Sequence, residues 1–148
     1  MRLRFAFGKT GLEAELPEGP RYRVLEAVWA QALEDETAAV ERAIDEPIGT
    51  VGLAELAKGR KSVAISVCDI TRPAPNRLTL PPVLRRLEQA GVPRESTYIL
   101  IATGLHRPAT DSEIVEILGA GIAGAYPVVN HNARELADHR HLGETKSG

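Results

Sequence analysis

Short apolar runs alternate with amphipathic segments between residues 61 and 130, and this alternation limits the possible folds more than any other feature of the sequence. The runs KSVAISV (61–67), STYILIA (96–102) and AGAYPVVN (123–130) predict strands. The segments PPVLRRLEQAG (81–91) and TDSEIVEILG (110–119) have the apolar spacing of helices. Strands that are apolar throughout and separated by helices favour a parallel sheet covered on both faces. We therefore expect an α/β fold with a Rossmann-like parallel sheet flanked by helices.

The ends of these two helices carry their own signals. Pro81 and Pro82 fall in the first turn of the expected first helix, where proline is tolerated, and Gly91 ends that helix. Thr110 and Glu113 have the spacing of a capping box at the start of the second helix. Both helices are therefore predicted with defined boundaries.

The N-terminal third follows a different pattern. RLRFAFG (2–8) and GLEAELP (11–17) alternate apolar and polar residues around a glycine-containing turn, which predicts a small antiparallel hairpin. Apolar residues are too dense over residues 22–33 to distinguish a strand from a helix, and we expect Trp29 to pack in the core. Two helices are predicted next, over residues 35–47 and 50–59.

Length and charge set the class of protein. A chain of 148 residues that is 43% hydrophobic can form one α/β domain with a real core and is too short for two ordinary ones. We therefore expect a single domain over residues 1–148. The 18 basic and 20 acidic residues are mixed along the chain and give a net charge of -2, so no basic stripe is available for a nucleic-acid backbone.

Cysteine content and the N-terminus bear on location. A single cysteine cannot form an internal disulfide, and the first residues, MRLRFAFGKTG, lack the apolar core and cleavage site of a signal peptide. No apolar stretch approaches the roughly 20 residues that span a bilayer. We therefore expect a cytoplasmic protein without a membrane partner.

Charged and polar residues follow two of the predicted strands directly. CDITRPAP (68–75) comes after the first strand and TGLHRPAT (103–110) after the second. Ligands of open parallel sheets bind outside the carboxyl ends of the strands, and strands adjacent in sequence are usually adjacent in the sheet, about 4.8 Å apart. We therefore expect Asp69, Arg72 and His106 to line one crevice.

The residue types in this crevice suggest a chemistry. Histidine exchanges a proton near neutral pH, and a nearby carboxylate can fix its tautomer and raise its basicity. Arginine offers a planar fork that matches a carboxylate or a phosphate. His106, Asp69 and Arg72 therefore suit proton transfer on a small anionic substrate. Donors that suit a phosphate stand beside the helix starts at Thr71, Thr103 and Gly104.

Each of these residues also has a structural interpretation. Asp69 could cap a turn before Pro73, Arg72 could pair with a surface acid, and His106 could bind a backbone carbonyl. The repeated arrangement of a strand followed by a polar motif favours the shared site over three separate structural roles. Cys68 has no partner that marks it as a nucleophile, and we expect it to be a small buried strand residue.

Three further histidines follow the third predicted strand, at positions 131, 139 and 141. Their spacing matches no strong zinc motif and no cysteine accompanies them, so we expect no metal site there. His131 is of more interest because it directly follows VVN and is a third strand-end residue. An exposed loop histidine is the alternative interpretation.

The two polar motifs together resemble the lactate racemase family, whose members use a nickel-pincer nucleotide. The resemblance rests on SVCDITRPAP (66–75) and IATGLHRPATDSE (101–113), and it covers most of the chain from about residue 40 onward. The hairpin region matches more loosely. Supporting segments are EPIGTVGLAELAKG, LPPVLRRLEQAG, VVNHNA and HLGET.

The resemblance implies a 2-hydroxy acid racemase or epimerase. In such enzymes the pincer nucleotide takes hydride from the substrate carbon while a histidine takes the hydroxyl proton, so that a keto acid forms before hydride returns to either face. His106 matches one of the two acid/base histidines of the family. Arg72 matches the arginine that holds the substrate, and Asp69 the acid of the same motif.

Members of the family are considerably longer than this chain, which ends before the region that supplies the cofactor-bound lysine, the second catalytic histidine and the nickel-binding histidine. We therefore expect a fragment of the N-terminal domain of a longer enzyme, inactive by itself, whose site is completed by the remainder of the full-length chain. A degenerate relative is the other interpretation. The alternative function is a non-catalytic α/β module that binds a small anion or a mononucleotide at the strand ends.

Overall fold

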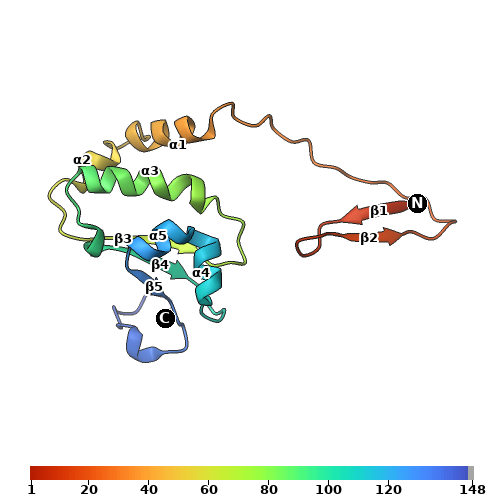
Figure 1. Ribbon diagram of the computed structural model, residues 1–148. Helices are drawn as coiled ribbons and strands as arrows, with labels where there is room; N and C mark the ends of the chain where they lie inside the picture. Colours follow the sequence, from red (N-terminus) through yellow and green to blue (C-terminus); the bar gives the residue numbers. More distant parts are fainter. Residues whose placement is uncertain (147–148) are drawn as a thin grey trace. The chain divides into compact units, whose positions relative to one another are not determined.

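The computed structural model describes residues 1–146, which divide into two compact units, one of residues 1–32 and one that begins at Leu33 (Figure 1). The first unit contains the antiparallel strands β1 (Arg2–Phe5) and β2 (Leu12–Glu15), so the expected hairpin is confirmed. Gly11 closes the turn at φ +78°, and a Cβ there would lie 3.1 Å from the Phe5 carbonyl oxygen. Only glycine fits that position without strain.

The rest of the first unit has no helix or strand, and the expectation that Trp29 packs in the core is wrong. The Trp29 side chain is 87% exposed, and Leu25 and Val28 are exposed beside it. The physical reason is size: a unit of 32 residues built on two four-residue strands has too little surface to enclose an indole. That residues 1–148 form one domain stays a prediction.

The second unit opens with two helices, as predicted. Helix α1 (Glu36–Asp45) begins where the Asp35 carboxylate accepts a hydrogen bond from the Ala38 amide at 2.9 Å. Helix α2 (Leu53–Ala57) is followed by Gly59 at φ +73°, a conformation that ends helices. A bidentate ion pair between Arg86 and Asp45, at 2.6 and 2.7 Å, joins α1 to helix α3 (Asn76–Gln89).

The sheet of the second unit is parallel and has the strand order β3-β4-β5, which confirms the predicted fold class. Strand β4 is central, and its Ile99 and Ile101 are fully buried. Short 3-10 turns flank the sheet at Arg94–Ser96 and Leu136–Asp138. The three strands are β3 (Val63–Cys68), β4 (Thr97–Ala102) and β5 (Val128–Asn130).

Helix α3 (Asn76–Gln89) starts five residues earlier than predicted, so Pro81 and Pro82 lie inside it. Each proline removes one backbone N–H and would normally interrupt a helix. Leu80 and Leu84, each 3% exposed, pack in the core against the sheet and stabilise the helix despite the two prolines. Tertiary packing therefore overrides the local signal. No helix of residues 1–146 is long and apolar enough to cross a membrane.

The last connection also differs from the prediction. Helix α4 (Asp111–Leu118) ends at Gly119, and α5 (Ala120–Ala125) begins directly after it. Residues 123–127, expected in the third strand, belong to α5 and to the turn into β5. Pro127 has no N–H for the strand ladder, although its carbonyl oxygen accepts a hydrogen bond from the Ile99 amide at 2.9 Å. Strand β5 is therefore limited to three residues.

Helices cover only one face of the sheet, and the expectation that both faces are covered is wrong for the described residues. The three parallel strands follow one another in the sheet in their sequence order, and such strands are joined by right-handed crossovers. Helix α3 and the α4–α5 pair therefore lie on the same side of the sheet (Figure 1). Cys68, expected to be buried, is exposed because its side chain points to the other face. The buried core on the helical side consists of Val67, Leu80, Leu84, Ile99, Ile101, Ala109, Ile117 and Leu118.

Candidate functional site

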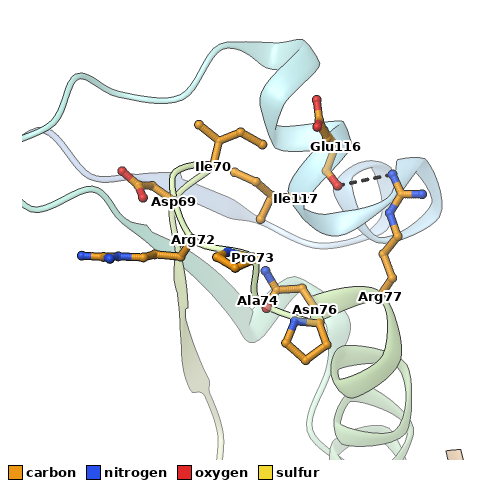
Figure 2. A pocket seen from close by; sticks show the side chains of 10 residues that line it. Asp69, Ile70, Arg72, Pro73, Ala74, Asn76, Arg77, Glu116 and Ile117 are labelled. Carbon is orange, nitrogen blue, oxygen red and sulfur yellow. Dashed lines mark hydrogen bonds between the residues drawn. The ribbon is translucent and has the colours of Figure 1, made fainter. Parts of the chain in front are cut away.

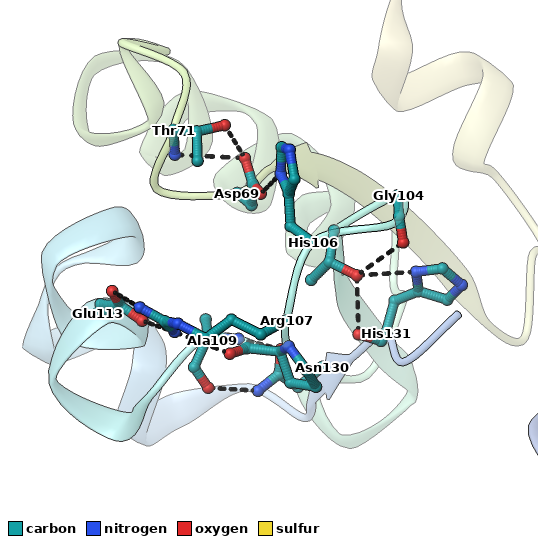
Figure 3. A network of polar contacts seen from close by, with 11 residues as sticks. Asp69, Thr71, Gly104, His106, Arg107, Ala109, Glu113, Asn130 and His131 are labelled. Atoms are coloured by element: carbon teal, nitrogen blue, oxygen red, sulfur yellow. Dashed lines mark hydrogen bonds and ion pairs between the residues drawn. The ribbon is translucent and has the colours of Figure 1, made fainter. Parts of the chain in front are cut away.

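The carboxyl ends of β3 and β4 lie side by side, as the sequence predicts. Cys68 at the end of β3 is paired in register with Ala102 at the end of β4, and each strand leads directly into a polar loop. The loop after β3 begins with Asp69, which is 7% exposed (Figure 2). The loop after β4 carries His106, whose Nδ1 lies 2.6 Å from Asp69 Oδ2 (Figure 3). The two strand ends therefore meet in one acid–histidine pair.

Asp69 is held by a second set of hydrogen bonds. Its Oδ1 accepts from the Thr71 hydroxyl at 2.6 Å and from the Thr71 amide at 3.2 Å. The Thr71 hydroxyl, and after it the His106 hydrogen bond, lower the pKa of the Asp69 carboxyl below its usual value, although burial acts in the opposite direction. The carboxylate is therefore ionised near neutral pH and accepts hydrogen bonds at both oxygens.

This state of Asp69 determines the tautomer of His106. A carboxylate has no proton to give, so Nδ1 of His106 must be the donor in the 2.6 Å contact. The remaining ring nitrogen, Nε2, has no hydrogen-bond partner among residues 1–146, and the His106 side chain is 56% exposed. A neutral ring then presents a free lone pair at Nε2, which can take a proton from a ligand.

Arg72 lies in the same loop but in a different hollow. Its backbone amide donates to the Asp69 carbonyl at 3.1 Å, whereas its guanidinium has no hydrogen bond or ion pair within the described part of the chain. Arg72 and Asp69 border an open hollow of about 330 Å³, which continues along the start of α3 to α4 (Figure 2). There Arg77 donates to the Glu116 carbonyl at 3.3 Å.

His106 borders a smaller hollow of about 80 Å³ with Thr71 and Ala109. Asp69 is common to both hollows. Asp69 thus contacts His106 directly and lines one hollow together with Arg72. Arg72 and His106 do not line the same hollow. The single crevice expected from the sequence is divided in two by the Asp69 segment.

The three residues predicted to contact the cofactor differ in their exposure and in the hydrogen bonds that they already make. The Thr71 hydroxyl is donated to Asp69. Thr103 is 2% exposed, and its hydroxyl lies 2.9 Å from the carbonyl oxygen and 3.0 Å from Nδ1 of His131, so it joins the end of β4 to the end of β5. Gly104 is exposed at φ +57° with open space on its Cβ side. Thr71 and Gly104 are exposed, whereas Thr103 is buried. Cofactor binding by these three residues stays a prediction.

Gly104 also determines how the His106 loop turns. The Thr103 carbonyl oxygen accepts a hydrogen bond from the His106 amide at 3.0 Å, which closes a tight turn at the end of β4. A residue with a side chain rarely adopts the positive φ that this turn needs at Gly104. The turn brings His106 back toward Asp69.

Asn130 supports the loop and was not identified from the sequence. It is the last residue of β5, and its side-chain amide makes two hydrogen bonds to the backbone of Ala109: Oδ1 accepts from the amide at 3.0 Å and Nδ2 donates to the carbonyl at 2.6 Å (Figure 3). Because Ala109 closes the His106 loop, this clamp ties the loop to the third strand. The signal in the sequence that could have identified Asn130 is its position as a polar residue at the end of the third predicted strand.

Arg107 and Glu113 form a second support for the His106 loop. The capping role of Glu113 was predicted from the sequence, but its ion pair with Arg107 was not. The predicted capping box is present, with the Thr110 amide donating to Glu113 Oε2 at 2.8 Å. The same carboxylate pairs with both terminal nitrogens of Arg107, at 2.7 and 2.8 Å. The Arg107 hydrogen bonds, followed by that of Thr110, lower the pKa of Glu113 to about 2. Glu113 therefore holds the residue next to His106 and the start of α4 together.

Two of the three later histidines contact each other. His131 and His139 approach with their Nε2 atoms 3.1 Å apart, and His139 Nδ1 lies 2.7 Å from the Glu135 carbonyl oxygen. Within residues 1–146, no group of three or more histidine, cysteine, aspartate or glutamate side chains is arranged to hold a metal ion. His131 is half-buried at the strand end, where it contacts Thr103.

Comparisons with known proteins all identify similarity to the same group of proteins, the lactate racemases. Residues 7–148 match the family described as Lactate racemase N-terminal domain. The chain is 38% identical over 115 residues to the lactate racemase of Lactiplantibacillus plantarum and 32% identical over 148 residues to that of Thermoanaerobacterium thermosaccharolyticum. It also superimposes on the structure of the lactate racemase apoprotein from Thermoanaerobacterium thermosaccharolyticum with a TM-score of 0.76 and 32% identity.

The matches cover most of this chain but a minor part of the relatives. They include 78% and 99% of this chain but 26% and 34% of the two curated proteins, and all of this chain but 34% of the solved one. The chain therefore spans about a third or less of the length of these relatives.

Proposed function

Because the chain belongs to the lactate racemase N-terminal domain family, we propose that it supplies one half of the active site of an enzyme that racemises lactate or another 2-hydroxy acid. The observation that carries the proposal is the Asp69–His106 contact of 2.6 Å at adjacent strand ends. An ionised acid bonded to one ring nitrogen of a half-exposed histidine leaves the other nitrogen free for proton transfer.

His106 would act as the acid/base. Inverting the configuration of a 2-hydroxy acid through its keto acid requires the hydroxyl proton to leave and to return. His106 Nε2 would take that proton, and the Asp69 carboxylate would stabilise the resulting imidazolium through Nδ1. The hydrogen bonds from Thr71 keep Asp69 ionised and oriented during this exchange.

Arg72 would bind the carboxylate of the substrate. A guanidinium without an internal partner is available for the two-point contact that arginine makes with a carboxylate. Its position beside Asp69, which borders both hollows, would place the bound acid next to the Asp69–His106 pair. The role of Arg72 is therefore binding and orientation.

The remaining chemistry would come from the nickel-pincer nucleotide that the resemblance implies for the full-length protein. Within residues 1–146, no three potential ligand side chains are grouped so that they could hold a metal ion by themselves. When bound, the nucleotide would supply the acceptor and donor of hydride at the substrate carbon. Its nickel would be held by the part of the protein outside residues 1–148, and Gly104 would offer backbone contact to the nucleotide.

The test is racemisation by the full-length protein after cofactor loading. A panel of single-enantiomer 2-hydroxy acids with methyl, aromatic and sugar-like side chains is incubated with the enzyme, and both enantiomers are measured by chiral chromatography. We expect at least one acid to approach a racemic mixture. If no acid is racemised while the loaded protein binds acids reversibly, the chain belongs to a binding module and the proposed catalytic role is wrong.

A further inference from the structure

The loop that carries His106 runs from Thr103 to Ala109, and two successive residues at the end of β5 hold both of its ends (Figure 3). At the far end, the Asn130 side chain donates from Nδ2 to the Ala109 carbonyl at 2.6 Å and accepts from the Ala109 amide at 3.0 Å. At the near end, the Thr103 hydroxyl donates to the carbonyl oxygen of His131 at 2.9 Å. We call these three hydrogen bonds the β5 clamp.

Between its two ends, the loop has few other restraints on His106. Leu105 is 85% exposed and the His106 side chain is 56% exposed, so core packing does not fix this part of the loop. The His106 ring is bonded to Asp69. The next residue, Arg107, pairs with Glu113, but its side chain is exposed and exposed ion pairs restrain a chain weakly. The position of His106 therefore depends mainly on how the ends of the loop are held.

The Ala109 end of the β5 clamp is the more specific one. Ala109 is 9% exposed, and one side chain, that of Asn130, binds both its backbone amide and its backbone carbonyl. The backbone N–H can only donate and the carbonyl oxygen can only accept, so the orientation of the Asn130 amide is fixed. Buried backbone groups need such partners, and a side chain with one donor and one acceptor at this spacing supplies both.

We propose that Asn130 is a positioning residue for the proton transfer assigned to His106. By holding Ala109, it fixes the course of the loop so that His106 Nδ1 meets Asp69 and Nε2 is presented to the substrate. Asn130 acts through Ala109 and the loop, and not by contact with a reacting group. The inference rests on the proposed function, because it takes His106 as the acid/base.

The β5 clamp should affect turnover more than substrate binding. Arg72, the residue proposed to bind the substrate carboxylate, belongs to the loop after β3, and none of the three hydrogen bonds of the clamp involves that loop. A catalytic group that is displaced by about 1 Å can lose about a hundredfold in rate. Loss of the clamp should therefore lower kcat and leave KM nearly unchanged.

A purely structural role for Asn130 predicts a different result. If Asn130 only stabilised the fold, its substitution would lower the Tm, whereas the folded protein would keep its kcat and the tautomer of His106. Turnover and the state of the His106 ring therefore distinguish positioning from stability.

The test is Asn130→Asp in the full-length, cofactor-loaded protein. Aspartate has nearly the same shape and can accept from the Ala109 amide, but it has no N–H for the Ala109 carbonyl. The matched control is Asn132→Asp, because Asn132 Oδ1 accepts from the Arg134 amide at 3.2 Å and aspartate keeps that hydrogen bond. We expect Asn130→Asp to lower kcat for racemisation by about ten- to hundredfold, with KM changed by less than about twofold. The control should match the wild type.

Imidazole nitrogen NMR shifts of His106 provide a readout that does not depend on turnover. The wild type and Asn132→Asp should show the Nδ1–H tautomer that the Asp69 contact fixes. Asn130→Asp should show a mixture of both tautomers, because the ring leaves Asp69 for part of the time. A folded Asn130→Asp protein with normal kcat and the fixed Nδ1–H tautomer would overturn the proposal.

Hydrogen exchange in the unsubstituted full-length protein tests the clamp if Asn130→Asp does not fold. The Ala109 amide, which donates to Asn130, should exchange at least about tenfold more slowly than the Leu105 amide of the same loop, for which residues 1–146 provide no acceptor. Equal exchange rates would show that the clamp does not hold the loop and would overturn the proposal.

These readouts separate the role of Asn130 from the proposed function. Mixed tautomers in Asn130→Asp together with no racemisation by the wild type would support the hold on His106 and reject the proposed function. Racemisation that is lost in His106→Ala but normal in Asn130→Asp would support the proposed function and reject the positioning role of Asn130.

Discussion

At the scale of single residues, Asp69 is the centre of the site because its two carboxylate oxygens serve different partners. One oxygen is occupied by Thr71 of its own loop and the other by His106 of the neighbouring strand end. The arrangement fixes the ring of His106 and its proton before any substrate arrives. An orienting acid of this kind can be tested apart from the base that it orients.

Replacing Asp69 by Asn should lower turnover in the full-length enzyme by about a hundred- to ten-thousandfold with little change in KM. An asparagine can turn its NH2 group toward His106 Nδ1, which moves the ring proton to Nε2 and removes the free lone pair. Imidazole nitrogen NMR shifts should then report the Nε2–H tautomer. Unchanged tautomer and turnover would show that Asp69 does not orient the base.

Replacing Arg72 by Ala should raise KM for the hydroxy acid and also slow turnover. A charge-assisted hydrogen bond to a substrate carboxylate contributes roughly 1.5–3 kcal/mol, which corresponds to about a ten- to hundredfold change in kcat/KM. Steady-state kinetics of the full-length protein provide the measurement. Arg85→Ala is the control and should leave both constants unchanged, because Arg85 is an exposed residue of α3 that pairs with Glu41 of α1. A normal KM in Arg72→Ala would exclude substrate binding by this residue.

The Asp69–His106 pair was predictable from the sequence pattern, but its surroundings were not. Asp69 and His106 were predictable because each directly follows an apolar strand, and parallel strands place such residues at one edge. The division between the Arg72 and His106 hollows was not predictable, because it depends on the conformation of the loop between β3 and α3. The clamp from Asn130 to Ala109 joins residues 21 apart, and no local spacing signals such a contact.

At the scale of elements, the start of α4 links secondary structure to the site. Glu113 caps the helix through Thr110 and pairs with Arg107, the neighbour of His106. Its pKa is lowered to about 2, so this carboxylate stabilises the fold above its unfolded pKa near 4.5 and loses that contribution as the pH falls toward 2. The contribution of this helix cap to stability should therefore be lost between pH 4.5 and about pH 2.

Replacing Glu113 by Gln should lower the Tm at pH 7 by no more than a few °C, because the exposed ion pair is screened by solvent while glutamine can still cap the helix. The difference from the wild type should shrink as the pH falls from 4.5 to 2. Thermal unfolding across this range provides the measurement. Glu95→Gln, which makes the same charge change at an exposed acid, is the control. A Tm difference that does not depend on pH would contradict the role of the carboxylate charge.

The elements themselves were predicted well where their signals were local. The capping box at Thr110 is a short motif, and it is present. The early start of α3 was missed because burial of Leu80 and Leu84 outweighs two interior prolines. The third strand was predicted too long, since AGIAGA over residues 120–125 is short and apolar and such runs fit either a helix or a strand.

At the scale of the whole molecule, the described residues supply one acid–histidine pair and an arginine whose side chain has no partner among them. Catalysis by differential stabilisation of a transition state requires acid, base and hydride carrier to be fixed together. On the proposed function, this chain supplies one side of that arrangement. Its activity therefore depends on what the full-length protein adds.

The 148-residue chain alone should neither racemise lactate nor retain nickel. None of its described residues forms a cluster of three metal ligands, and the second acid/base is expected outside it. Chiral chromatography and metal analysis after gel filtration provide the measurements. Stoichiometric nickel or measurable turnover in this chain would overturn the view that it holds half a site.

The most direct test of the central claim is the rate at which the full-length, cofactor-loaded protein converts one enantiomer of lactate into the other, compared between the wild type and His106→Ala. The account predicts that the substitution lowers turnover by about a hundred- to ten-thousandfold and changes substrate affinity much less, because a general acid/base acts as the proton moves. Near-normal turnover in a folded, cofactor-loaded His106→Ala protein would show that the histidine is structural and that the Asp69–His106 pair is not the acid/base of the reaction.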